Sequence, residues 1–100
     1  KALPNAASTP ELNIKMAEGE PFALLDELKA SARFTDAEEV ISIDGLRVEY
    51  KDGFGLARPS NTTPVVVLRF EADNPAALAR IQDDFRRVLR IARPKLELPF

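Results

Sequence analysis

The chain has 100 residues, of which 45% are hydrophobic and 30% are charged, and this size and composition fit one compact globular domain. Cysteine and histidine are both absent, which excludes disulfides, thiolate metal sites and any catalytic pair built on a thiol or an imidazole. A formal net charge of -2 and apolar runs too short to span a bilayer predict neither a nucleic-acid partner nor a membrane partner.

The first segment, residues 1–10, is small and polar and carries two prolines, so we predict an interdomain linker or hinge there. Residues 11–100 are predicted to form one domain. Because the chain begins at Lys1 and its only methionine is Met16, we expect a fragment of a longer protein. The absence of cysteine and of a signal-peptide pattern leads us to expect a cytoplasmic location.

A strand and an amphipathic helix are predicted next. Leu12, Ile14 and Met16 alternate with polar residues, which is the spacing of a strand. Pro21 can occupy the first position of a helix, and apolar residues then recur at helical spacing. The predicted core stripe of this helix consists of Phe22, Leu25, Leu28 and Ala32.

Two hairpins are then predicted to join three strands, at residues 40–43, 46–50 and 54–57. In the first hairpin, a two-residue loop at Asp44-Gly45 pairs Ile43 with Leu46. The same register pairs Ile41 with Val48, which puts all four apolar side chains on one face.

The second hairpin is predicted to turn through a three-residue loop that ends in a left-handed Gly53. This loop length pairs Tyr50 with Phe54, and Val48 with Leu56. A two-residue loop would instead pair Phe54 and Leu56 with polar residues of the preceding strand.

The last two elements are a strand and a helix. Val65–Ala72 is apolar on both faces and is predicted to be a central strand. Asn74 and Pro75 are predicted to start a helix that ends before Pro94. Its core stripe is predicted to be Leu78, Ile81, Phe85, Val88 and Ala92. The element order predicts an α+β domain, with a mostly antiparallel sheet of about four to five strands and two helices packed on one face.

Charged residues on this last helix are predicted to pair with one another. Asp83 and Asp84 have arginines three or four positions away, so we expect a solvated face with ion pairs and no catalytic carboxylate pair. Basic residues near the helix end are expected to complement the helix dipole: Arg86, Arg87, Arg90, Arg93 and Lys95. The acidic residues elsewhere lack the spacing of a magnesium or calcium loop, and we expect no metal in this chain.

The segment from Arg58 to Pro64 concentrates hydrogen-bond donors between two predicted strands. Arg58 can bind two oxygens of a phosphate, and the hydroxyls and the amide that follow can reach the other oxygens. The prolines at both ends stiffen the segment and reduce the cost of ordering it around an anion. Composition alone more often describes a plain polar connection, which is the alternative. The candidate phosphate-binding residues are Arg58, Ser60, Asn61, Thr62 and Thr63.

Several stretches of the sequence resemble the last, fourth domain of bacterial members of the α-D-phosphohexomutase family. They are Ser8-Thr9-Pro10-Glu11, Asp44-Gly45-Leu46-Arg47-Val48 and Gly53-Phe54-Gly55-Leu56-Ala57-Arg58-Pro59-Ser60-Asn61-Thr62-Thr63-Pro64. The similarity continues through residues 65–73 and the closing helix, so it covers essentially the whole chain. Asn61-Thr62, where other branches often carry Gly-Thr, is similar to the phosphomannomutase/phosphoglucomutase branch.

The resemblance implies a role in an enzyme without implying catalysis by this chain alone. Family members reversibly interconvert the 1-phosphates and 6-phosphates of hexoses such as mannose and glucose, through a bisphosphorylated intermediate. They use a phosphoserine and a magnesium ion, and both lie in earlier domains, so no catalytic residue and no cofactor is expected here. The implied partners are the hexose phosphate and the other domains of one monomeric enzyme.

The resemblance also assigns residues to the phosphate contact. Arg58, Ser60, Asn61 and Thr62 are implied to grip the phosphate that is not reacting, and Thr63 is a weaker candidate. In the family this domain moves to open and close the active-site cleft, and the segment at residues 3–10 is implied to flex.

Two other classes of function stay open. A free-standing binding module, for example for nucleic acid, would also combine helices with one side of a sheet. The acidic balance disfavours it, as does the expected placement of Tyr50, Phe54 and Phe70 in the core. A pure interaction domain would leave the loop indifferent to phosphate.

Overall fold

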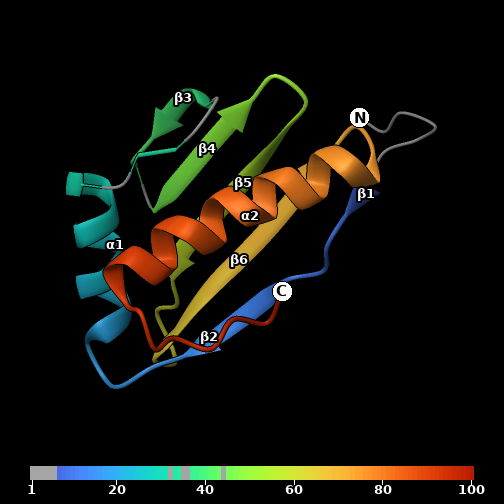
Figure 1. Ribbon diagram of the computed structural model, residues 1–100. Helices are drawn as coiled ribbons and strands as arrows, with labels where there is room; N and C mark the ends of the chain where they lie inside the picture. Colours follow the sequence, from blue (N-terminus) through green and yellow to red (C-terminus); the bar gives the residue numbers. More distant parts are fainter. Residues whose placement is uncertain (1–6, 32, 35–36, 44) are drawn as a thin grey trace.

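The computed structural model describes residues 7–31, 33–34, 37–43 and 45–100, and these form six strands and two helices (Figure 1). The elements are, in chain order, β1 (Ala7–Ser8), β2 (Leu12–Lys15), α1 (Glu20–Ser31), β3 (Ala37–Ile41), β4 (Leu46–Tyr50), β5 (Gly53–Pro59), β6 (Val65–Ala72) and α2 (Pro75–Ala92). The strand pairs are antiparallel, in the order β1-β6-β5-β4-β3, with β2 also paired to β6. The predicted α+β architecture is confirmed, with six strands where about four to five are expected.

Strand β6 is central, as its apolar sequence predicts. β5 pairs with one edge of β6, whereas the short strands β1 and β2 share the other edge. The register shifts by one residue between these two short strands, next to Pro10, which has no N–H to donate to a ladder. Thr9 still ties this edge to β6, because its N–H donates to Phe70 O at 3.0 Å and its Oγ1 accepts from Phe70 N at 3.2 Å.

Strand β1 lies within the segment for which a linker is predicted. Its two residues pair with Glu71 and Ala72 of β6. Residues 1–6 of the same segment lie outside the described residues, and the linker stays a prediction.

Helix α2 begins and ends where the sequence predicts. Asn74 caps it, because its side-chain oxygen accepts from Ala77 N at 2.8 Å, and Pro75 follows in the first turn. The helix ends at Ala92, just before Arg93 and Pro94. The predicted core stripe is confirmed, with three buried and two partly buried members: Ile81, Phe85, Val88, Leu78 and Ala92.

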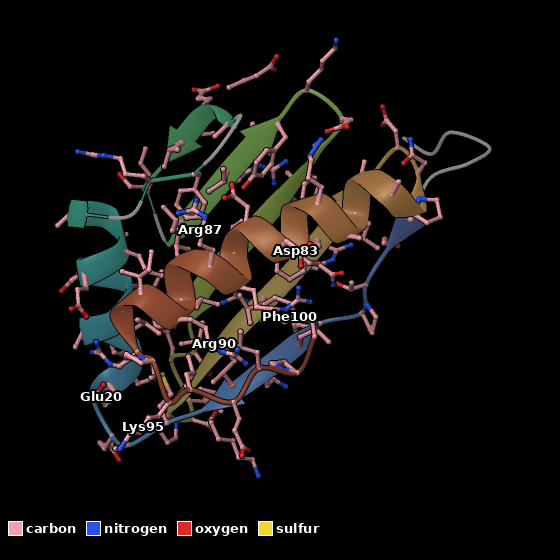
Figure 2. The ribbon with its side chains drawn as sticks, viewed as in Figure 1. Glu20, Asp83, Arg87, Arg90, Lys95 and Phe100 are labelled. Atoms are coloured by element: carbon pink, nitrogen blue, oxygen red, sulfur yellow. The ribbon has the colours of Figure 1, made fainter. Side chains whose placement is uncertain are left out.

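Both helices pack on one face of the sheet and enclose one hydrophobic core. α2 runs along β5 and β6, and α1 lies across the end of β5 beside the C-terminal part of α2 (Figure 1). The Phe85 ring lies at the centre, with centroids 5.1 Å from Phe70 and 5.0 Å from Phe34. The residues after α2 fold back, so that the Phe100 ring lies 5.0 Å from Phe70 (Figure 2).

Helix α1 is rotated about its axis relative to the prediction. Leu24, Leu25 and Leu28 are buried in the core, whereas Phe22 is 52% exposed, so its predicted core position is wrong. Each residue turns a helix by about 100°, and a face centred on the three leucines therefore turns position 22 toward the surface. Ala32, the last member of the predicted stripe, lies outside the described residues.

The predicted register of the first hairpin is wrong by one residue. β3 pairs Val40 with Val48, and Ile41 with Arg47. Ile43 lies in the turn and is 78% exposed, and Asp44 lies outside the described residues. Leu46, Val48 and Tyr50 already fill the core side of β4, so the core is closed at this edge without the side chain of Ile43.

The second hairpin also differs from its prediction. β4 and β5 turn through two residues, Lys51 and Asp52, because Tyr50 pairs with Gly53. Gly53 does not have a positive φ angle, contrary to the prediction. The consequence is that Gly53 and Gly55, and not Phe54, stand on the same face of the sheet as the buried residues of β4.

Phe54 therefore lies on the face of the sheet that points away from the helices. It is partly exposed, and the Arg47 guanidinium stacks on its ring, 4.0 Å from the centroid. Its expected core position is wrong, for a reason of volume. The ring of Phe85 occupies the space beside Gly55, where a Cβ atom would lie 2.3 Å from Phe85 Cε1.

A buried polar contact joins α2 to β4. The Tyr50 hydroxyl donates to Asp84 Oδ2 at 2.7 Å, and Arg87 pairs with the same carboxylate. Asp84 is only 7% exposed, so its predicted place on a solvated face is wrong, although its ion pair with Arg87 is as expected. Burial and the neighbouring carboxylate raise the pKa of Tyr50, so the hydroxyl remains a donor at neutral pH. The predicted surface pair of Asp83 with Arg86 is present.

We expect Gly55→Ala to lower the free energy of unfolding by roughly 1–3 kcal/mol, the usual cost of overpacking a core. The added methyl group would collide with the Phe85 ring, and chemical denaturation measures the change. The matched control is the same substitution in a Phe85→Leu background, where the methyl group should cost less. An equal cost in both backgrounds would contradict this contact.

Candidate functional site

The loop that the sequence singles out joins β5 to β6 and is held by backbone hydrogen bonds. Ser60 N donates to Val65 O at 2.9 Å, and Val65 N donates to Thr63 O at 2.8 Å. Met16 N donates to Pro64 O at 2.9 Å, which ties the loop to the end of β2. The backbone of the loop is thus anchored, although most of its side chains are exposed.

Ser60 organises the loop from within. Its Oγ accepts from Thr62 N at 3.2 Å and from Thr63 N at 3.4 Å. The hydroxyl oxygens of Thr62 and Thr63 lie 3.3 Å and 3.4 Å from the same atom. Two backbone N–H groups and two hydroxyls therefore converge on one point, at distances longer than the about 2.7–3.0 Å of strong bonds.

Arg58 lies next to Gly45, a position at which the structure leaves no room for a side chain. The register pairs Leu46 with Ala57, which puts Gly45 opposite Arg58 at the end of the two strands. A Cβ atom at position 45 would lie 2.7 Å from Arg58 Cβ. The φ angle of Gly45 is also +119°, which side chains other than glycine rarely adopt. Gly45 thus lets Arg58 keep its place.

A pocket of about 400 Å³ opens between α1 and the end of β5. One wall is formed by Arg58, Pro59 and Asn61, with Gly45 beside them. The facing wall comes from α1 and consists of Phe22, Leu25, Asp26 and Lys29. The pocket thus has one wall from the predicted loop and one wall from a helix that is distant in sequence.

The predicted site residues therefore fall into two groups. Arg58 and Asn61 line the pocket, and Ser60, Thr62 and Thr63 form the hydroxyl cluster of the same loop. Within the described residues, the Arg58 side chain takes part in no hydrogen bond and no ion pair. A guanidinium that lines a pocket without a carboxylate partner is free to bind an anion.

Sequence reasoning missed the wall that α1 contributes. Phe22, Leu25, Asp26 and Lys29 follow the spacing i, i+3, i+4 and i+7, which marks one face of a helix. That spacing was the available signal. The spacing alone could not show that this face of α1 would line the same pocket as Arg58.

The position of α1 depends on the end of α2. Arg93 lies just beyond α2, where its guanidinium donates to Ala92 O at 2.9 Å, as expected for a residue that complements the helix dipole. It also pairs with Glu20 and Glu27 of α1. The hydrogen bond to Glu27 is the main reason why the pKa of Arg93 is raised. Figure 2 shows Glu20 at the end of the molecule where α2 ends and Lys95 follows.

The described part of the chain contains no group of three or more His, Cys, Asp or Glu side chains that could hold a metal ion. Nor does it contain a helix that is long and apolar enough to cross a membrane.

Comparison with known proteins gives a consistent family. Residues 11–88 match the family described as phosphoglucomutase/phosphomannomutase, C-terminal domain. The chain is 56% identical over 98 residues to a phosphoglucomutase of Neisseria meningitidis, covering 97% of this chain and 21% of the relative. It is 50% identical over 99 residues to a phosphomannomutase/phosphoglucomutase of Pseudomonas putida, covering 99% of this chain and 21% of the relative.

A solved structure gives the same result. A phosphoglucomutase/phosphomannomutase family protein of Burkholderia thailandensis is 65% identical and superposes with a TM-score of 0.87, over 98% of this chain and 20% of that chain. The chain thus spans about a fifth of the length of the relatives it matches. It belongs to the phosphoglucomutase/phosphomannomutase family, in which it corresponds to the C-terminal domain.

Proposed function

We propose that this chain is the mobile, substrate-phosphate-binding domain of a phosphohexomutase. The whole enzyme would reversibly interconvert hexose 1-phosphate and hexose 6-phosphate, with mannose or glucose as the sugar, through a bisphosphorylated intermediate. The names of the relatives support the reaction class, and the position of Arg58 supports the role of this domain. The other domains would be its partners.

The observation that carries the proposal is the guanidinium of Arg58, which lines the pocket, has no ion-pair partner among the described residues and lies next to a loop rich in donors. A planar guanidinium can donate to two oxygens of one phosphate, which suits a dianionic ester better than a single ammonium group would. Asn61 lines the same pocket and adds an amide N–H₂ group.

The hydroxyl cluster supports the same function. The donors of Thr62 and Thr63 converge on Ser60 Oγ through long hydrogen bonds. A phosphate oxygen is a stronger acceptor than a hydroxyl, because it carries charge. Such an anion can recruit these donors with little rearrangement, since the loop ends are already fixed.

A fixed anion clamp would solve a particular problem of the reaction. The bisphosphorylated intermediate has to present either phosphate to the reacting group, so the phosphate that is not reacting must be held in both orientations of the sugar. Contacts made to phosphate alone allow this. The energy of binding at this remote end can then orient the reacting end.

The catalytic groups would lie elsewhere in the enzyme. We propose, from the family to which this domain belongs, that the phosphoserine and the magnesium ion are in the domains that precede this one. The role of this chain is then to bind and orient, and to close over the substrate by movement relative to the other domains.

A titration with inorganic phosphate, followed by backbone amide NMR, tests the proposal directly. We expect weak, saturable shifts confined to residues 60–63 and to the pocket around Arg58, because the donors there would change acceptor. Shifts spread over the sheet upon addition of an oligonucleotide, with none from phosphate, would favour a nucleic-acid-binding module instead.

Substitution of the guanidinium is the second test. In the full-length enzyme, Arg58→Ala should raise the KM for glucose 1-phosphate and lower kcat/KM by roughly 10-fold to 100-fold, the effect of losing about 1.5–3 kcal/mol of charged hydrogen bonds. Arg58 has no partner among the described residues, so thermal unfolding should be nearly unchanged. A variant that loses its fold would show that Arg58 is structural.

The third test addresses the glycine beside Arg58. Gly45→Ala should displace Arg58 and so weaken phosphate binding, because the new Cβ atom would lie 2.7 Å from Arg58 Cβ. Gly19→Ala is the control, since Gly19 also has a positive φ angle but has nothing within 4 Å of its would-be Cβ. If both variants lose stability but neither loses affinity for phosphate, Gly45 does not position Arg58.

A further inference from the structure

We propose that Lys29 of α1 is a second cationic contact for the phosphate that Arg58 holds, and that Asp26 one turn earlier weakens the binding of that phosphate. The inference rests on the proposed function and adds specificity-determining residues to the same site. It makes α1, and not only the loop after β5, part of the phosphate site.

The first argument is geometric. Lys29 and Asp26 stand on the face of α1 that forms one wall of the pocket, and Arg58 stands on the other wall. The volume of about 400 Å³ exceeds the volume of a phosphate group, so the pocket that both cations line has room for this anion. The long stem of a lysine lets its ammonium group adjust to an anion placed by a more rigid guanidinium.

The second argument concerns the partners of these groups. Neither Asp26 nor Lys29 forms an ion pair with another described residue, and they do not pair with each other. Other charged residues of α1 are engaged, since Glu20 and Glu27 both pair with Arg93. Among the residues that the structure describes, the ammonium group of Lys29 therefore has no ion pair to give up when a ligand binds.

The third argument is the balance of charge. A phosphate monoester near the loop carries close to two negative charges, and Arg58 supplies one positive charge. The carboxylate of Asp26 on the facing wall repels the same anion. Lys29 offsets this repulsion and brings the three side chains to a net positive charge, which favours a dianion over a neutral sugar.

Core packing and ion pairs fix the position of α1, and with it the position of Lys29 at the pocket. Leu24, Leu25 and Leu28 of α1 are buried in the core. Arg93 forms ion pairs with Glu20 and Glu27, which lie two turns apart on the same helix. Because the core fixes the rotation of α1, Lys29 faces the pocket without a conformational change.

Steady-state kinetics of the full-length enzyme with glucose 1-phosphate test the inference. Lys29→Gln should raise KM by roughly threefold to tenfold, with a smaller change in kcat, as for a partly solvated charge close to an anion. Asp26→Asn should lower KM, because it removes the repulsion. Lys29→Arg should restore KM to within about twofold, since it keeps the charge.

Lys51→Gln is the matched control. It makes the same change of charge on an exposed lysine in the β4–β5 turn, at the opposite end of these strands from the pocket. An equal rise in KM for Lys51→Gln and Lys29→Gln would show that the effect comes from the net charge of the protein, which would overturn the inference. An unchanged KM in Lys29→Gln would also overturn it. If Arg58→Ala also leaves KM unchanged, the proposed function itself fails, which separates the two outcomes.

Discussion

The contact between Gly55 and the ring of Phe85 is the constraint on which the rest of the structure depends. It turns the smallest residues of β5 toward α2, so the helix can lie close to the sheet and place its aromatic ring at the centre of the core. Because side chains alternate along a strand, the same choice turns Arg58 away from the core and sets it against Gly45. A packing contact in the middle of the sheet therefore decides where the candidate anion site lies at its end.

Helix α1 connects the core to that site through two different faces. Its leucines pack inward, while the mixed face with Phe22, Asp26 and Lys29 forms a wall of the pocket. Arg93 fixes the helix against the end of α2. The position of the α1 wall is thus set by the packing of the two helices.

The loop itself is organised locally, as the proposed phosphate-binding role requires. Backbone hydrogen bonds at Ser60 and Val65 close it, and Ser60 Oγ collects the donors of Thr62 and Thr63. The proposed phosphate contact needs no other group from outside this loop and the pocket beside it.

The sequence by itself determined the α+β class, the central strand, both ends of α2 and the loop that carries the candidate site, because caps, turns and periodicity are local properties of the chain. Only the tertiary structure decided the two hairpin registers, the rotation of α1, the burial of Asp84 and the exposure of Phe22. These depend on how the volumes of distant side chains fit together, as the Phe85 ring fits the space at Gly55, and no pattern along the chain records such a fit.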